Sequence, residues 1–205
     1  LRNARGLKRR PKIAKFEGAY HGSYDEVLVS LTPTVADAGS AAAPKAMSGS
    51  ISTTPAELQN TVVLPLNDLE ACNQILRAHK AELAALILEP VQRGFLVAEA
   101  EFLKGLRETT EALDILLIFD EIMSGFRMEK LGAVQTLVGV DPDLMTLGKI
   151  IGGGFPCGAF LGSEEAMDIV TVFADVASGR HELIQALHAL PNFATPKGHD
   201  RPAIA

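Results

Sequence analysis

Lys149 is the first residue whose surroundings point to chemistry. It is followed by Ile150-Ile151 and then by three glycines, and the residues before it are mostly apolar. Three interpretations of this lysine compete. A phosphate-binding loop of the P-loop type would need Ser or Thr directly after Gly-Lys, and neither is present. A solvated surface lysine is the ordinary case, but the apolar neighbours argue against it. The third is a partly desolvated amine able to attack a carbonyl carbon, with the glycines letting the backbone approach a bulky ligand.

Asp120 is the second such residue. It follows the apolar run 115–119, which is typical of a buried strand, and a buried carboxylate needs a hydrogen-bond or ion-pair partner. Its neighbour Glu121 would suggest a carboxylate pair for glycosidase or metal chemistry, but adjacent strand residues point to opposite faces of a sheet. A protonated pyridine nitrogen, as in pyridoxal phosphate (PLP), is another suitable partner. The carboxylate keeps such a ring cationic, and the ring then accepts the electrons of a carbanion.

The elements that would position these residues alternate between strand and helix. Apolar residues at helical spacing separate the expected strands, and Asn67 or Asp68 would cap one of the helices. Strands that are apolar throughout indicate an α/β fold, with a mostly parallel sheet covered by helices on both faces. Ligands bind at the carboxyl ends of strands in such sheets, where Glu89, Asp120 and Lys149 fall. The expected strands are residues 13–16, 61–64, 83–88, 115–119 and 143–147.

Two segments depart from this alternation. Residues 32–55 are rich in Ala, Ser, Thr, Gly and Pro and contain few large apolar residues. We expect them to form a loop or lid near the site, with no regular structure or only short helical turns. After about residue 168 the pattern weakens, and residues 169–205 are an atypical tail with several prolines. The expected domain is therefore residues 1–168.

Composition narrows the class of protein. The net charge is −6, and the basic residues that cluster at the start of the chain have no interleaved aromatic residues. We therefore expect a solvated helix face there and no nucleic-acid partner. The apolar runs are too short to cross a bilayer, and no secretory signal follows the basic start. Cys72 and Cys157 form neither a disulfide framework nor a metal-ligand spacing. This pattern favours a cytoplasmic protein with reduced thiols.

Four separated stretches, in the same order along the chain, resemble the class III aminotransferase family. They are KFEGAYHGSYD (15–25), LEPV (88–91), FDEIMSGFR (119–127) and GVDPDLMTLGKIIGGGFPCGA (139–159). The resemblance covers roughly residues 1–168 and is strongest to the glutamate-1-semialdehyde 2,1-aminomutase branch. Met123 favours that branch, because ornithine-type members have Gln at this position. Some β-amino-acid aminotransferases share the Met.

The resemblance implies the large domain of a fold-type I PLP enzyme whose active site lies at a homodimer interface. Lys149 matches the lysine that forms a Schiff base with PLP and then moves a proton. Asp120 matches the partner of the pyridine nitrogen. Ile122 and Tyr20 match the residues that pack on the two faces of the ring. For Tyr20, packing within a turn is the alternative.

Other matched positions have no defined role. His21 and Glu89 match positions close to the cofactor. Arg127 suits either a clamp for a substrate carboxylate or a structural ion pair. Residues 32–55 fall where the aminomutases have a gating loop. The family's phosphate-binding Ser-Gly-Thr-type turn and its Gly-Thr-x-x-Gly-Asn-Pro-like segment find no match. We therefore expect a fragment of a longer enzyme that is inactive alone.

The expected function is that of a PLP-dependent aminomutase or aminotransferase acting on a small amino acid or amino aldehyde. In an aminomutase the amino group moves to the neighbouring carbon, whereas in an aminotransferase the product leaves and a keto substrate enters. The alternatives are a class III aminotransferase acting on another amine or a β-amino acid, and a truncated, non-catalytic remnant. A nucleotide-binding α/β domain is disfavoured because the phosphate-loop spacing is absent.

Overall fold

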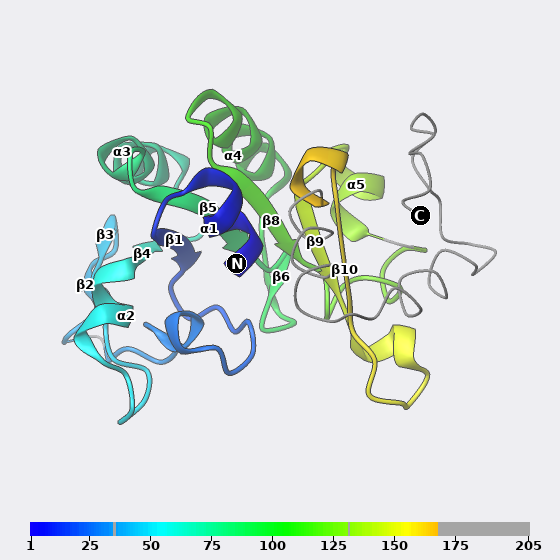
Figure 1. Ribbon diagram of the computed structural model, residues 1–205, viewed down its shortest axis with the longest axis horizontal. Coiled ribbons are helices and arrows are strands. Elements are labelled where there is room, and N and C mark those ends of the chain that lie inside the picture. Colours follow the sequence, from blue (N-terminus) through cyan, green and yellow to red (C-terminus); the bar gives the residue numbers. More distant parts are fainter. Residues whose placement is uncertain (35, 131, 168–205) are drawn as a thin grey trace, which may run out of the picture.

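A six-stranded sheet forms the centre of the molecule (Figure 1). The computed structural model describes residues 1–34, 36–130 and 132–167, so the tail predicted at 169–205 lies outside the described residues. The strand order is β10-β9-β8-β5-β1-β4, and all neighbours pair in parallel except β10, which is antiparallel to β9. The strands are β1 (Lys12–Phe16), β4 (Thr61–Leu64), β5 (Leu83–Leu88), β8 (Leu116–Asp120), β9 (Leu144–Leu147) and β10 (Ala159–Gly162).

The five strands expected from the apolar runs are therefore confirmed to within two residues at each end, as is the mostly parallel α/β class. β10 was not expected. Its apolar residues, Ala159 to Leu161, form a run of only three, too short to indicate a strand from sequence, and the strand is largely exposed.

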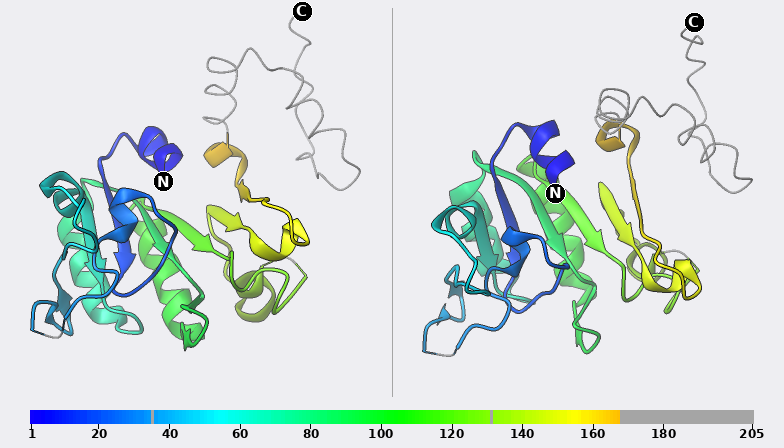
Figure 2. Two further views of the ribbon diagram at one scale, coloured as in Figure 1. Left: turned by 90° about the horizontal axis from the view of Figure 1, so that it is seen from below. Right: turned by 60° about the horizontal axis from the view of Figure 1, so that its bottom comes forward.

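Helices cover both faces of this sheet, as predicted. Figure 2 shows α3 (Leu69–His79) and α4 (Ala100–Ala112) on one face and α1 (Arg2–Lys8) on the other. The larger core lies under α3 and α4, where Phe16 of β1 meets Phe102 edge-to-face with ring centroids 5.7 Å apart. A smaller core lies under α1 and includes Ala4, Ile87 and Ile118. The two faces of each central strand are thus both buried, which explains why the strands are apolar throughout.

The turn before α3 resolves the choice between its two candidate caps. Asp68 accepts a hydrogen bond from the backbone N–H of Ala71 at 3.0 Å and is the helix cap. Asn67 has a positive φ of 60°. Its side chain bonds the backbone carbonyl of Val97 and the backbone N–H of Glu99, which ties this turn to the start of α4.

Most of residues 32–55 lacks helix and strand, as expected from their composition. The exception is an exposed two-stranded antiparallel ribbon of β2 (Gly39–Ser40) and β3 (Ala43–Pro44). It lies beside β4, at the edge of the sheet opposite to β9 (Figure 1). Within one chain the ribbon is therefore remote from the residues that follow β9, and its role as a lid stays a prediction.

Short elements complete the described chain. They are the 3-10 turn η1 (Asp25–Leu28), α2 (Pro55–Asn60), the hairpin of β6 (Val91–Gln92) and β7 (Leu96–Val97), α5 (Ala133–Val138) and the 3-10 turn η2 (Lys149–Gly152). No helix among residues 1–34, 36–130 and 132–167 is long and apolar enough to cross a membrane.

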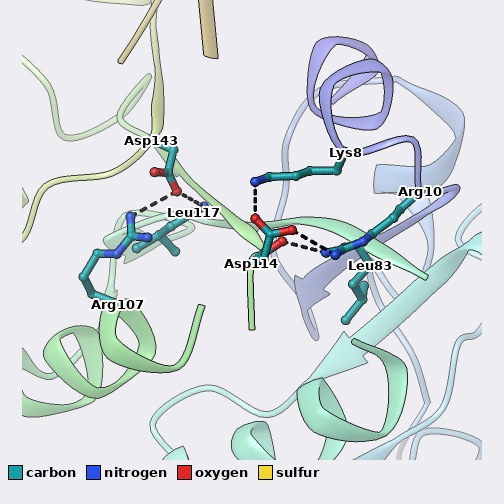
Figure 3. Close-up of polar contacts among 7 residues, drawn as sticks. All are labelled: Lys8, Arg10, Leu83, Arg107, Asp114, Leu117 and Asp143. Atoms are coloured by element: carbon teal, nitrogen blue, oxygen red, sulfur yellow. Dashed lines mark hydrogen bonds and ion pairs between the residues drawn. The ribbon is translucent and has the colours of Figure 1, made fainter. Parts of the chain in front are cut away.

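Ion pairs hold the amino ends of the strands together (Figure 3). Asp114, in the turn between α4 and β8, binds Lys8 and lies 2.9 Å from Nη2 of Arg10. The hydrogen bond from Lys8 and the positive charges of both partners lower the pKa of this carboxyl. Just before β9, Asp143 binds Arg107 at 3.0 Å and accepts the backbone N–H of Leu117 at 2.7 Å.

The basic start of the chain therefore has partners within the fold. Arg5 binds Glu26, and Lys12 binds Glu82, in addition to the pairs that Lys8 and Arg10 form with Asp114. This supports the interpretation of the cluster as part of the folded surface.

Candidate active site at the carboxyl ends of the strands

The alternation of side chains along β8 decides which way Asp120 points. Leu116 and Ile118 belong to the core under α1, whereas Leu117 and Phe119 belong to the core under α3 and α4. Asp120 continues the first series, so its carboxylate lies on the α1 face at the end of the strand. The strand thus carries a buried acid to the edge of the sheet where ligands bind in this class of fold.

Three hydrogen-bond donors hold the Asp120 carboxylate. Its Oδ1 accepts the backbone N–H of Ile122 and the hydroxyl of Thr146, each at 3.2 Å. Its Oδ2 lies 2.8 Å from Nδ1 of His21. Thr146 is the residue of β9 directly opposite Asp120 in the parallel register. Asp120 is 5% exposed, and partners from three separate segments fix the orientation of its carboxylate.

Glu121 points away from this group, as predicted for adjacent residues. Its carboxylate is fully buried and binds the hydroxyl of Ser124 and, at 3.1 Å, the backbone N–H of Val134. Val134 lies in the first turn of α5, where backbone N–H groups have no partner within the helix. Glu121 is therefore a structural acid that joins the end of β8 to α5, and the two acids do not form one site.

Polar contacts from Glu89 and Arg93 anchor the loop that carries Tyr20 and His21, residues 17–31. Glu89, at the end of β5, accepts the backbone N–H of Tyr20 at 2.9 Å. Arg93 donates to the backbone carbonyls of Gly18 at 2.7 Å and Leu31 at 2.9 Å. These contacts give Glu89 a structural role that the sequence left open, which is to position the loop.

Lys15 is a second anchor of the same loop. Its side chain is fully buried and donates to the backbone carbonyl of Val29 at 2.7 Å. Burial, with a smaller contribution from the positive charge of Arg93, lowers the pKa of Lys15 from 10.5 to about 8. The negative charges of Glu89 and Glu17 act in the opposite direction. The loop at 17–31 is therefore supported by the buried amine of Lys15, whose pKa is lowered.

Lys149 begins η2, three residues beyond the register position of Asp120 on the neighbouring strand. It is a non-glycine residue with a positive φ of 48°, a conformation that costs free energy and is concentrated at functional positions. The prediction that apolar neighbours shield the Lys149 side chain from solvent is wrong for this chain. Lys149 is exposed, as is Ile150, and the lysine side chain has no hydrogen-bond or ion-pair partner among the described residues.

The glycines around Lys149 meet specific steric demands. A Cβ atom on Gly148 would lie 3.3 Å from Cγ2 of Ile122, so the absence of a side chain lets Ile122 pack against the backbone just before the lysine. Gly153 and Gly154 have φ values of +55° and +101°, which form the turn after η2. Two of the three consecutive glycines therefore serve the turn itself.

A pocket of about 610 Å³ opens on the α1 face beside Asp120. Asp120 and Ile122 both line this pocket, and the other lining residues come from α1, the loop at 17–31 and the strands near their ends. Tyr20 and Lys149 are not among the lining residues, and Tyr20 is 44% exposed. The other lining residues are Leu1, Arg2, Asn3, His21, Tyr24, Ile87, Ile118, Thr146 and Phe160.

The pocket has the hydrogen-bond acceptor and the apolar surfaces that a protonated pyridine ring requires. Asp120 supplies a fixed carboxylate, and Ile122, Ile87 and Ile118 supply apolar walls. Nε2 of His21 is buried and has no hydrogen-bond partner in the described part of the chain. An unpaired buried polar atom of this kind is uncommon unless water or a ligand completes it. These residues therefore fit PLP as the predicted cofactor.

Arg127 and Thr146 are two residues for which the structure differs from the sequence analysis. Arg127 is exposed, and no ion pair of its side chain occurs within residues 1–34, 36–130 and 132–167, so the structural ion pair is not found there. Thr146 was missed by the sequence analysis. The signal for it was available only through the register of β9, because it takes its place beside Asp120 by pairing across two strands.

Comparison with known proteins identifies the family. The family described as Aminotransferase class-III matches residues 1–178. The chain is 45% identical over 173 residues to the glutamate-1-semialdehyde 2,1-aminomutase of Caldivirga maquilingensis, and the match covers 83% of this chain and 38% of that protein. The chain thus spans less than half the length of such relatives.

Solved structures of related enzymes support the same family. An ω-transaminase from Sphaerobacter thermophilus superposes with a TM-score of 0.75 at 43% identity, covering 82% of this chain and 38% of that one. A glutamate-1-semialdehyde aminomutase from Pseudomonas aeruginosa in complex with PMP gives a TM-score of 0.67 at 30% identity, covering 84% and 36%. The predicted fold, family and PLP dependence of that family are confirmed. The chain belongs to the class III aminotransferase family.

Proposed function

We propose that these residues form the central part of the large domain of a PLP-dependent aminomutase or aminotransferase, with the cofactor bound at the pocket beside Asp120. The observation that supports it most strongly is the Asp120 carboxylate, buried at a strand end and held by three donors from three segments. When bound, PLP supplies a cationic ring that accepts the electrons released at the carbon next to the substrate amine.

The residues of the chain divide the remaining tasks between them. Asp120 holds the proton on the ring nitrogen. Ile122 packs on one face of the ring, and Tyr20, from the anchored loop, covers the other. Lys149 would hold the cofactor through its amine, and as a free amine it would take up and return a proton at the substrate as general base and acid.

The exposure of Tyr20 and Lys149 fits a site that is completed by further protein. Phe155 in the turn after η2 is 80% exposed, and Phe95 and Val97 of the β6–β7 hairpin are also largely exposed. Large apolar side chains in such positions are usually covered by another domain or subunit. We propose a homodimer of the intact, cytoplasmic enzyme, in which a covered Lys149 gains the desolvation that it lacks in the single chain.

Glutamate 1-semialdehyde is the first substrate to test, because the aminomutase from Caldivirga maquilingensis shares 45% identity with this chain. A second candidate is transamination of another amine or a β-amino acid, which the likeness to the Sphaerobacter thermophilus ω-transaminase favours. The two differ in stoichiometry. An aminomutase returns the amino group to the same molecule, whereas an aminotransferase needs an added keto acid to turn over repeatedly.

The test is therefore to give the full-length protein that carries these residues glutamate 1-semialdehyde alone, and separately an amine with a keto acid. Conversion of the amino aldehyde without a keto acid would support the aminomutase. Turnover only with both substrates would support the aminotransferase. No turnover in either assay, by protein shown to be folded and supplied with PLP, would contradict both.

A further inference from the structure

The hairpin of β6 and β7 carries two polar side chains that the proposed chemistry does not use, Gln92 and Arg93. Gln92 is 4% exposed and donates from Nε2 to the backbone carbonyl of Glu17 at 2.8 Å. Arg93 donates from Nε to the carbonyl of Gly18 at 2.7 Å and from Nη2 to that of Leu31 at 2.9 Å. These two carbonyls belong to opposite ends of the same loop, so the side chain of Arg93 bridges the ends.

The shape of the guanidinium group suits this bridge. The group is planar, and its Nε and one Nη nitrogen present two N–H bonds along one edge. The carbonyl oxygens of Gly18 and Leu31 both accept hydrogen bonds along this edge of Arg93. A lysine offers its donors from a single nitrogen on a flexible stem and does not reproduce their spacing. The contact therefore depends on arginine itself and not only on a positive charge.

The backbone of Arg93 is held in a strained conformation beside the loop. Its φ is 56°, and a non-glycine residue in this region persists only where the surrounding structure fixes it. The backbone N–H of Arg93 donates to Oε1 of Glu89 at 3.4 Å. Oε2 of the same buried carboxylate accepts the backbone N–H of Tyr20 at 2.9 Å. One acid thus joins the turn of the hairpin to the part of the loop that carries the tyrosine.

The side chain of Arg93 also orients the peptide unit between Gly18 and Ala19. The N–H of this unit donates to the backbone carbonyl of Phe16 at 3.1 Å, and its carbonyl accepts from Arg93. Gly18 has a φ of +74° and no side chain that limits its rotation. Loss of the guanidinium would therefore leave this unit held at one end only, directly before the peptide unit that carries the N–H of Tyr20.

We infer that Arg93 is a positioning residue for Tyr20, an inference that rests on the function proposed above. Its guanidinium closes the loop and sets the direction from which the tyrosine ring reaches the cofactor. Lys15 and Gln92 hold the same loop at other points. Loss of Arg93 should therefore leave the loop attached to the domain, but with Tyr20 no longer aligned with the face of the cofactor ring.

The variants Arg93→Met and Arg93→Lys in the full-length protein separate the roles of this side chain. Met keeps an unbranched stem without donors, and Lys keeps the charge without the two-donor edge. Arg77→Met, on the exposed surface of α3, controls for loss of an arginine. Arg93→Met is also combined with Tyr20→Ala in a double-mutant cycle, because residues that act through one contact have non-additive effects.

Three quantities are measured for each protein. They are the Kd of the apoenzyme for PLP, the rate of hydrogen exchange at the amides of residues 18–20, and the melting temperature, which verifies that the variant is folded. We expect Arg93→Met and Arg93→Lys to raise the Kd about twofold to tenfold, the range of an aromatic contact. Both should also speed exchange at residues 18–20. In the Tyr20→Ala background, Arg93→Met should raise the Kd no further, and Arg77→Met should match the wild type throughout.

Several results would overturn the inference. A wild-type Kd in Arg93→Lys would mean that charge alone suffices, and additive effects in the cycle would mean that Arg93 does not act through Tyr20. An unchanged Kd in Tyr20→Ala, or unchanged exchange at residues 18–20 in Arg93→Met, would contradict it as well. Failure of the folded wild type to bind PLP would instead overturn the proposed function, whereas the exchange rates would still report whether Arg93 holds this part of the loop.

Discussion

The buried amine of Lys15 gives a prediction whose size follows from the structure. Its pKa is lowered from 10.5 to about 8, chiefly by burial. Between these two pH values the folded protein has already released a proton that the unfolded chain still binds. Stability therefore rises with pH in this window, and the contribution present above pH 10.5 is lost as the pH falls through 8. A lowering of this size corresponds to about 3 kcal/mol.

Substitution of Lys15 by Met should remove this dependence. Met has a similar length and no charge, so the variant avoids the cost of a buried ammonium group at pH 7. It also leaves the carbonyl of Val29 without its donor, which costs about 1–3 kcal/mol. We therefore expect a net change in stability of no more than about 2 kcal/mol at pH 7, and a variant less stable than the wild type at pH 10.

The assay is urea unfolding of the wild type and of Lys15→Met at pH 7, 8, 9 and 10. Lys80→Met, at an exposed lysine just after α3, serves as the matched control and should track the wild type throughout. Other groups that titrate in this range contribute equally to all three proteins and cancel in the differences. Equal pH slopes for the wild type and Lys15→Met would refute the burial argument.

Three further predictions follow from the site and its supports. Glu121→Ala should lower the free energy of unfolding by about 2–4 kcal/mol, because it leaves buried donors of Ser124 and Val134 unpaired, whereas Glu121→Gln should cost less; urea unfolding measures both. Asp120→Asn in the full-length protein should keep some PLP, by absorbance titration, but lose about tenfold to a hundredfold in kcat, and an unchanged kcat would count against the role of the acid. Residues 1–205 alone should bind PLP poorly and turn over no substrate, because the family's phosphate-binding segments find no match in this sequence, and efficient transamination by this chain would contradict that expectation.

The strands were predictable because burial on both faces leaves an unmistakable run of apolar residues, as in β5 and β8. The same logic placed Asp120 at a strand end and separated it from Glu121, since side-chain alternation is a local property. β10 and the separate ribbon of β2 and β3 were missed because they are exposed and only two to four residues long, too short for a recognisable apolar run.

The contacts within the site were harder to foresee. His21, Thr146 and Glu89 reach their partners across 99, 26 and 69 residues, so only the folded sheet brings them together. The error at Lys149 has a related cause. Apolar neighbours along the chain do not bury a side chain when it lies in a turn at the surface, as η2 does here.

The attachment of the cofactor to Lys149 is the central claim, and reduction with borohydride tests it most directly. The full-length protein is incubated with PLP, reduced, digested and mapped by mass spectrometry. We predict the PLP adduct on Lys149 and its loss in Lys149→Ala. Lys15 is the internal comparison, because its pKa of about 8 would favour reaction, but its complete burial should exclude PLP. An adduct on Lys15 or on any other lysine in place of Lys149, or full activity of Lys149→Ala, would contradict the account.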